Sequence, residues 1–308
     1  MLGAFAAVAS AALWAYASTR YALASRAVGS ARVNLTRSST VLPLFLVATL
    51  VSTHGHLLAG ISGTRAAWLA LSVLCAYGFA DNLFFAAARR VGVTTALAIA
   101  SSYPLWAALL GTVWRGERFG VVRAAGTLLC VGGIIALIAL SPRAVELDKG
   151  EPVKKAHEHA RSTLRDAREG ILLALLTSVL WAGNTVSVKL GGTGIDAWHA
   201  NLIRFLIAWP ILAATSALVT RPTRDDAVAR AAYRGLIVPS LLEAFVGSSL
   251  FVYGLAHTDL AVGATLSSLA PLLSVPFALF YGEERWSPPR FAAVTATVAG
   301  VIILIVGA

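Results

Sequence analysis

Two acidic residues lie inside long apolar stretches of the chain. Asp81, followed by Asn82, interrupts the apolar segment 66–88, and Glu243 interrupts the segment 235–256. An ionised side chain within a membrane helix costs about 2.5 to 3.5 kcal/mol to insert, so it usually faces the interior of a helical bundle. A carboxylate that leaves water also binds a proton more readily, unless a cation or several hydrogen-bond donors compensate. The two residues therefore predict a buried polar site for a cationic group or a proton.

The composition indicates the environment that must position these residues. Of the 308 residues, 57% are hydrophobic and only 13% are charged, and the mean hydropathy is +0.75. A water-soluble domain carries roughly 25% charged residues, so that class is excluded. The net charge of +10 comes from basic residues between apolar segments rather than on one soluble face. This distribution favours the lipid bilayer as a partner and argues against nucleic acid.

Apolar segments of membrane-spanning length predict an all-α polytopic membrane protein. A helix needs about 20 apolar residues to cross the hydrocarbon core. Ten segments qualify: residues 2–19, 36–56, 66–88, 93–114, 121–140, 170–190, 198–219, 235–256, 259–281 and 289–307. The one long polar interval, residues 141–169, alternates basic and acidic side chains and is predicted to be a solvated linker, helical in part.

The second half of the chain repeats the first at an offset of 167 residues, which is the difference between Trp181 and Trp14. Other pairs at that offset are Asn34 and Asn201, Arg37 and Arg204, Pro104 and Pro271, Glu117 and Glu284, and Gly133 and Gly300. Chance similarity between segments rich in Leu and Ala does not explain matches of these residue types. With five helices in each repeat, the second copy enters the membrane from the opposite side. We therefore predict ten transmembrane helices as two inverted five-helix repeats, residues 1–140 and 170–308, joined by the linker 141–169.

Inverted repeats are typical of secondary transporters, which place the substrate site near the midplane between the halves. The two carboxylates break this symmetry, because the offset aligns Asp81 with Ser248 and Glu243 with Ala76. A structural requirement shared by the halves would be repeated in both. The asymmetry favours a role in substrate binding or coupling, with a buried, paired structural carboxylate as the alternative.

Several residues near these carboxylates are predicted to shape the same site. Trp14 and Trp181 lie too deep in their helices for the aromatic belt at the membrane surface, and each could pack or stack on a substrate. Asn184 follows Trp181 by three residues and so shares its helix face, and Tyr77 precedes Asp81 by four residues with the same consequence.

Two arginines obey the repeat. Arg37 and Arg204 fall near the predicted starts of the second and seventh helices. Extension of the side chain to the membrane surface is the preferred interpretation, with binding of an anionic group as the alternative. Glu117 and Glu284 lie in turns and are predicted to cap the next helix or to pair with nearby arginines.

Pro104 and Pro271 fall within the fourth and ninth predicted helices. Proline removes a backbone donor and leaves a point where a helix can bend. We therefore expect these helices to line the cavity and to flex there as gates. The neighbouring Ser101, Ser102, Ser267 and Ser268 are expected to satisfy backbone groups or to bond across helices.

Together these motifs are familiar. In each half a Ser-rich run with a proline leads to a Gly/Glu turn: Ser101-Ser102-Tyr103-Pro104 precedes Arg115-Gly116-Glu117-Arg118, and Ser267-Ser268-Leu269-Ala270-Pro271 precedes Gly282-Glu283-Glu284-Arg285. With Leu-Trp-Ala in the first and sixth helices, this pattern resembles the EamA-type repeat of the drug/metabolite transporter superfamily. The resemblance implies a transporter, favoured as an exporter, of amino-acid-like or other small amphipathic metabolites. Exchange for protons is one option, and the cell (inner) membrane of a bacterium is the implied location.

Other function classes are weaker on the same residues. A membrane-embedded enzyme would need a nucleophile and base, paired acids or metal ligands, and the chain has no HExxH or GxSxG motif. A scaffold would not require an inverted repeat. No cofactor or metal is predicted, since His157 and His159 in a charged linker make a poor metal site.

Lys and Arg residues are concentrated on the linker side, which places that side in the cytoplasm and both termini outside. The family's usual basic cytoplasmic N-terminus implies the reverse.

Overall fold

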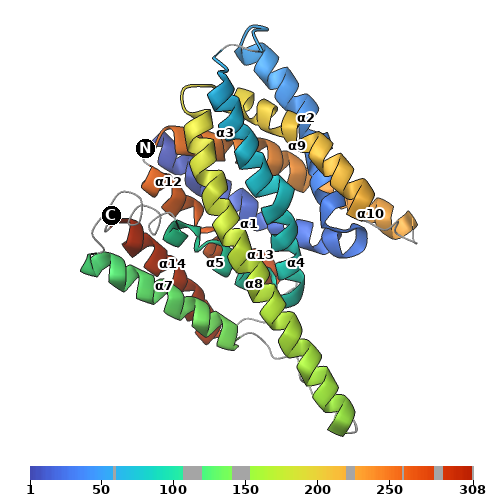
Figure 1. The fold of residues 1–308 in the computed structure, drawn as a ribbon, viewed down its shortest axis with the longest axis vertical. Coiled ribbons are helices and arrows are strands. Elements are labelled where there is room, and N and C mark those ends of the chain that lie inside the picture. The colour runs from blue at the N-terminus through green and yellow to red at the C-terminus, as the bar shows by residue number, and fades with distance from the viewer. Residues whose placement is uncertain are drawn as a thin grey trace.

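The computed structural model describes residues 1–57, 60–106, 120–140, 153–219, 226–258, 260–280 and 287–306. Within these ranges the elements are helices, with no β-strand (Figure 1). The first half contains α1 (Leu2–Val28), α2 (Ser30–Ser52), α3 (Gly63–Val73), the π-helix η1 (Leu74–Ala80), α4 (Asp81–Val91), α5 (Val93–Ala100) and α7 (Val121–Leu140). The second half contains α8 (Val153–Gly192), α9 (Ala197–Val219), α10 (Asp226–Pro239), the π-helix η2 (Ser240–Gly247), α11 (Ser248–Ala256), α12 (Leu260–Ser267), α13 (Ala270–Phe280) and α14 (Pro288–Val306). The predicted all-α class is confirmed.

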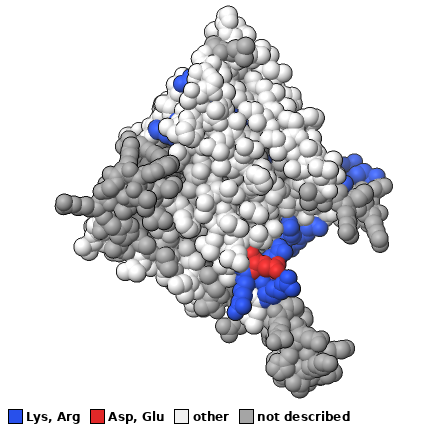
Figure 2. Space-filling model, in the orientation of Figure 1, with Lys and Arg blue, Asp and Glu red and all other residues white. Residues whose placement is uncertain are grey.

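The outer surface is apolar over most of its height. Six helical stretches of the described residues are long and apolar enough to cross a membrane: Leu2–Val28, Ser30–Ser52, Gly63–Val91, Leu164–Gly192, Ala197–Leu218 and Ala227–Ala256. Large side chains such as Phe5, Val47 and Phe79 are exposed on these helices. Figure 2 shows a broad uncharged face, with described charges gathered mainly toward one end of the molecule. Such a surface fits contact with lipid tails, where large apolar side chains gain little by turning inward.

Several helices begin or end away from the predicted positions. α1 continues to Val28 instead of ending near residue 19, and α2 begins at Ser30 instead of residue 36. Arginines and serines near these ends lower the local hydropathy without breaking the helix. α8 begins at Val153, so the described part of the predicted linker is helical and continues into the sixth membrane segment. The turn residues Glu117 and Glu284, and the end of the fourth predicted helix, lie outside the described residues.

The third and eighth membrane segments each contain a π-helix at the equivalent position. η1 joins α3 to α4 and η2 joins α10 to α11, and a shift of η1 by the 167-residue offset from Trp14 to Trp181 places it on η2. π-turns are rare and occur frequently at functional sites. Tyr77 lies in η1, Asp81 directly follows it, and Glu243 lies in η2. The repeat therefore places the same wide helical turn beside both predicted carboxylates.

The fourth and ninth predicted membrane helices are interrupted at equivalent points. α5 ends at Ala100 and a turn at Ser101 and Ser102 precedes the next helical residues, 103–106. α12 ends at Ser267, and a turn precedes α13. Pro104 and Pro271 thus lie in the first turn of a new helical segment, where proline removes no helical hydrogen bond. The expectation that each proline lies mid-helix is wrong, because the break lies just before it.

The last helices of the two halves pack closely through equivalent glycines. α7 and α14 lie side by side (Figure 1). A Cβ added to Gly133 would meet the backbone and side chain of Thr297, and one added to Gly300 would meet the backbone of Cys130. The repeat relates these two contacts to each other. Small residues allow such close helix approach in a bilayer, and here they join the two halves.

Candidate functional site

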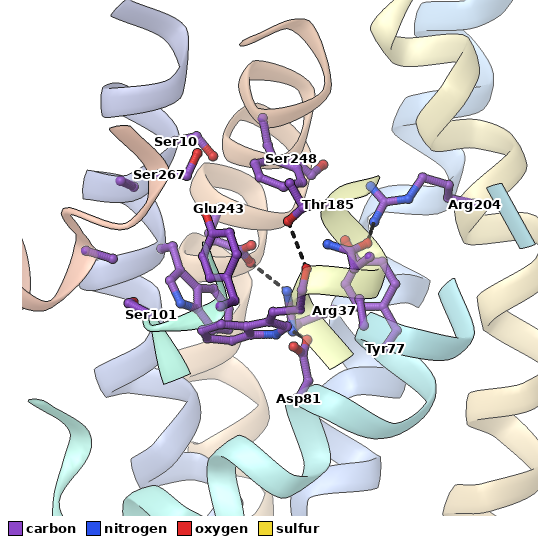
Figure 3. Close-up of a pocket in the computed structure, with 18 residues that line it drawn as sticks. Ser10, Arg37, Tyr77, Asp81, Ser101, Thr185, Arg204, Glu243, Ser248 and Ser267 are labelled. Atoms are coloured by element: carbon purple, nitrogen blue, oxygen red, sulfur yellow. Dashed lines mark hydrogen bonds and ion pairs between the residues drawn. The ribbon is translucent and has the colours of Figure 1, made fainter. Parts of the chain in front are cut away.

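A cavity of about 120 Å³ lies between the two halves (Figure 3). It is lined by Ser10, Ala11, Trp14, Arg37, Ala76, Tyr77, Asp81, Ser101, Tyr103, Trp181, Asn184, Thr185, Arg204, Glu243, Ser248, Phe251, Ser267 and Ala270. Many of these residues are partners under the repeat, as Trp14 is with Trp181 and Arg37 with Arg204. The cavity therefore lies where the pseudo-symmetry axis of the two halves passes. At about 30 Å³ for each water, it has room for about four water molecules or one small ligand.

Arg37 joins the two predicted carboxylates in one buried network. Its Nη1 donates to Asp81 Oδ2 at 2.6 Å, and its Nη2 donates to Glu243 Oε2 at 2.9 Å. Nη1 also donates to Asn34 Oδ1 at 3.0 Å, and the Tyr21 hydroxyl donates to Glu243 Oε2 at 3.0 Å. The side chains of all three charged residues are at most 9% exposed. One cation thus holds two acids from opposite halves of the chain.

Aromatic rings surround this guanidinium. Its central carbon lies 4.5 Å from the ring centre of Tyr21, 5.4 Å from that of Tyr77 and 5.6 Å from that of Trp14. Rings at such distances attract a cation through their negative faces, more strongly where water is excluded. Trp14 also contacts Trp181 edge to face at 5.6 Å. The aromatic residues therefore stabilise Arg37 on one side and form apolar walls of the cavity on the other.

Arg204 has a different set of partners. Its Nε donates to Ser72 Oγ at 3.0 Å, its Nη1 to Asn201 Oδ1 at 2.9 Å and its Nη2 to Asn184 Oδ1 at 3.1 Å. All three acceptors are neutral. The Tyr77 ring centre lies 5.4 Å from the central guanidinium carbon of Arg204, the same distance as from that of Arg37. Tyr77 thus lies between the two repeated arginines.

The expectation that Arg37 and Arg204 reach the membrane surface is wrong. Both residues are 2% exposed, and both line the internal cavity. α2 begins at Ser30, so Arg37 lies nearly two turns inside its helix instead of at its start. In each half, the arginine donates to an asparagine three residues earlier, Asn34 or Asn201. This repeated Asn-Leu-Xaa-Arg motif was the sequence signal for a buried pair.

The structure brings most of the predicted site residues to one cavity. Trp14, Tyr77, Asp81, Trp181, Asn184 and Glu243 all line it. Asn82 instead lies outside the lining, where its side chain contacts the Asn34 amide at 3.4 Å and donates to the Gly78 carbonyl at 3.1 Å. Tyr21, Thr185 and Ser248 also belong to the site or its network and were not predicted. Nothing in their spacing distinguishes them from helix-packing residues.

The serines beside the helix breaks divide between two positions. Ser102 donates to the Ile99 carbonyl at 2.6 Å and lies 3.1 Å from the Ser178 hydroxyl, which matches the predicted bonding across helices. Ser101 and Ser267 line the cavity. Among the described residues, no group of His, Cys, Asp and Glu could hold a metal ion. The side chains of His157 and His159 lie outside those described.

Comparison with known proteins agrees with this architecture. A solved crystal structure superposes with a TM-score of 0.64 over 99% of both chains at 17% sequence identity, which shows a shared fold. A search of curated proteins found no match. The model of the EamA-like transporter family matches twice, over residues 1–139 and 168–306. Those matches cover both halves, and members of that family are membrane transporters of the drug/metabolite type. This chain belongs to the EamA-like transporter family.

Proposed function

We propose that this protein is a secondary transporter that exports a small metabolite by alternating access. The observation that carries the proposal is the internal cavity, which residues from both halves line at the repeat axis. A site at that position can open to either side of the membrane when one half rocks against the other. The inner membrane of a bacterium is the location that we propose for this export.

The interrupted helices supply a route for the motion. Ser101, Tyr103, Ser267 and Ala270 line the cavity at or beside the two breaks. Interrupted membrane helices are common at transporter sites because unwound backbone can face a polar cavity while the flanking segments stay helical. We propose that the segments beginning near Pro104 and Pro271 tilt at these breaks when the cavity changes sides.

The Arg37 network is the proposed coupling element. Asp81 comes from the first half and Glu243 from the second, and both contact the same guanidinium. A tilt of one half would lengthen at least one of these contacts and free a carboxylate to bind a proton. Proton exchange would then be linked to the conformational change, which is the form of coupling that this network favours.

Reconstituted vesicles provide the test. Proteoliposomes are loaded with a metabolite mixture, and a proton gradient is imposed across their membrane. The rate at which each metabolite leaves is then compared for the wild type, Asp81→Asn and Glu243→Gln. Saturable flux of an unchanged compound, with a pH profile altered in either variant, is expected. Binding without flux would favour a scaffold, and a chemically changed product would favour a membrane-embedded enzyme. Wild-type flux and pH dependence in both variants would leave the carboxylates with a structural role only.

The orientation is a separate proposal. Arg90 and Arg165 both pair with Glu169 of α8, and Arg89 precedes Arg90 in the last turn of α4. Figure 2 shows basic side chains together toward the end of the molecule where α8 extends beyond the bundle in Figure 1. Positive residues are retained in the cytoplasm, which supports a cytoplasmic position for this end and an external one for both termini. A reporter fused to the C-terminus should then be active only outside the cytoplasm, and cytoplasmic activity would reverse the assignment.

A further inference from the structure

Arg204 is a buried cation whose contacts leave its charge unpaired. None of the ion pairs among the described residues includes it, and its three hydrogen-bond acceptors are a hydroxyl and two amides. A cation at 2% exposure is costly to bury unless another charge compensates. Because Arg204 lines the cavity, the compensating charge can come from a bound molecule.

The repeat shows what is missing around Arg204. In the first half the residue that pairs with arginine is Asp81, and its equivalent in the second half is Ser248. Glu243, the other partner of Arg37, aligns with Ala76. The positions that would supply a carboxylate to Arg204 by symmetry are therefore neutral, and both of them line the cavity.

The hydrogen-bonding capacity of Arg204 is also only partly used. A guanidinium carries five N–H donors, and the three contacts use one on each nitrogen. One N–H on each terminal nitrogen therefore has no partner among the described residues. Two donors are the number that a carboxylate accepts in a bidentate contact with arginine.

We infer that Arg204 binds a carboxylate group of the transported metabolite. Transport of that metabolite rests on the proposed function, whereas the binding itself does not. The carboxylate takes the place that Asp81 fills beside Arg37, and the rest of the molecule packs on Trp14, Trp181 and Tyr77. The cavity of about 120 Å³ favours a small ligand, since a cavity of about 150 Å³ holds benzene.

The charges in the cavity indicate how the bound carboxylate is balanced. The cavity holds two arginines and two acids, so its charges balance in sum, but both acids contact Arg37 and neither contacts Arg204. An added carboxylate therefore leaves one negative charge in excess. A positive charge that balances this excess would be stabilised most beside Asp81 and Glu243, because these two acids share the single cation Arg37. Either an ammonium group on the same molecule or a proton taken up with it can supply that charge.

Four related probes separate these possibilities on the wild-type protein. Leucine carries both charges, 4-methylpentanoate only the carboxylate, 3-methylbutylamine only the ammonium, and leucinamide the ammonium with a neutral amide. A ligand that binds the folded state raises the melting temperature in detergent. We expect stabilisation at millimolar concentration by the carboxylates and none by the amine or the amide. Stabilisation by leucine alone marks an ammonium as the second charge, whereas stabilisation by 4-methylpentanoate that grows as the pH falls marks a proton.

Variants test the residue itself. Arg204→Gln should weaken binding of the stabilising carboxylate at least tenfold, and Arg204→Lys should lose less because the charge remains without the planar fork. Arg65→Gln removes a positive charge outside the cavity and serves as the control, since the Arg65 guanidinium donates to the backbone carbonyls of Gly60 and Thr193. Unchanged affinity in Arg204→Gln would overturn the inference.

The ligand series decides the question even if Arg204→Gln fails to fold. Equal stabilisation by leucine and leucinamide, or none by either carboxylate, would also overturn it. Failure of the proposed transport function can be told apart from failure of this inference. If a carboxylate binds in a way that depends on Arg204 but no flux is seen, the inference stands and the transport function is rejected. If a cation is transported equally well by the wild type and Arg204→Gln, the transport function stands and the inference is rejected.

Discussion

Arg37 and Arg204 occupy equivalent positions in the two halves, yet their surroundings differ in charge. Both are buried, both donate to an asparagine three residues earlier, and both lie 5.4 Å from Tyr77. Arg37 is paired with two carboxylates, and Arg204 contacts only neutral acceptors among the described residues. The buried Asn–Arg pair is present in both halves, so it belongs to the repeated fold. The carboxylates lie beside one arginine only, and this difference lets a pseudo-symmetric protein bind an asymmetric molecule.

The largest expected effect follows from removing the first arginine. Arg37→Gln leaves Asp81 and Glu243 buried without a cation, and breaking such a pair typically costs about 3 to 5 kcal/mol. The free energy of unfolding, measured by titration with sodium dodecyl sulfate in mixed micelles, should fall by that amount. The matched Arg204→Gln should change it by no more than about 1.5 kcal/mol, because lost hydrogen bonds are offset by removal of an unpaired charge.

A neutral triple variant separates charge from packing. Combining Arg37→Gln with Asp81→Asn and Glu243→Gln removes the unpaired charges and should restore most of the lost stability, since buried ion networks are often replaceable by neutral groups. If Arg37→Gln and Arg204→Gln cost the same, the two arginine sites do not differ as the contacts indicate.

A smaller effect is expected from the hydroxyl that supports the first site. Tyr21 donates to Glu243 Oε2 at 3.0 Å, and a buried hydrogen bond to a charged group contributes about 1.5 to 3 kcal/mol. Tyr21→Phe should lower the free energy of unfolding within that range. Tyr16→Phe is the control on the same helix, because the Tyr16 ring packs on Phe277 and its hydroxyl has no hydrogen bond with a described residue. A loss of the same size in both variants would assign the effect to packing.

The fold followed from the sequence more fully than the site did. Hydropathy and the repeat locate the helices, because insertion in a membrane selects for apolar length and the repeat fixes the pairing of the halves. They do not predict η1 and η2, since a π-turn changes backbone bonding without changing hydropathy. Nor do they predict that the breaks precede Pro104 and Pro271, because proline fits the first turn of a helix as well as a bend.

The site was predicted where polarity contrasts with a long apolar segment. Asp81 and Glu243 stand out on that basis, and their asymmetry under the repeat is what selected them. Arg37 was assigned to the surface because polar residues 30 to 36 made its helix look shorter than it is. Arg37 contacts Asp81, which is 44 residues away in the sequence, and Glu243, which is 206 residues away. Only the tertiary structure shows that these residues meet.

The next prediction converts the second site into a copy of the first. Ser248 is the equivalent of Asp81, so Ser248→Asp should give Arg204 an internal counter-ion. That carboxylate would compete with a bound one, and the affinity for a stabilising carboxylate probe should fall about tenfold, or 1.4 kcal/mol. Ser248→Asn is the matched control of the same size, and it should retain binding. Equal affinities in the two variants would place the ligand away from Arg204.

The smallest effect on stability is expected at the prolines, where the two halves are alike rather than different. Pro104 and Pro271 each lie in the first turn of a helical segment that follows a break. Alanine there adds one backbone N–H and increases the freedom of the unfolded chain, so each variant should lose about 0.4 to 1 kcal/mol. If the breaks are the points of tilting, a helix that continues through either break slows the change of access. Flux in vesicles should then fall severalfold in both variants while the concentration for half-maximal flux stays the same. Unchanged rates in both would show that the prolines are passive and that the motion uses other points in the helices.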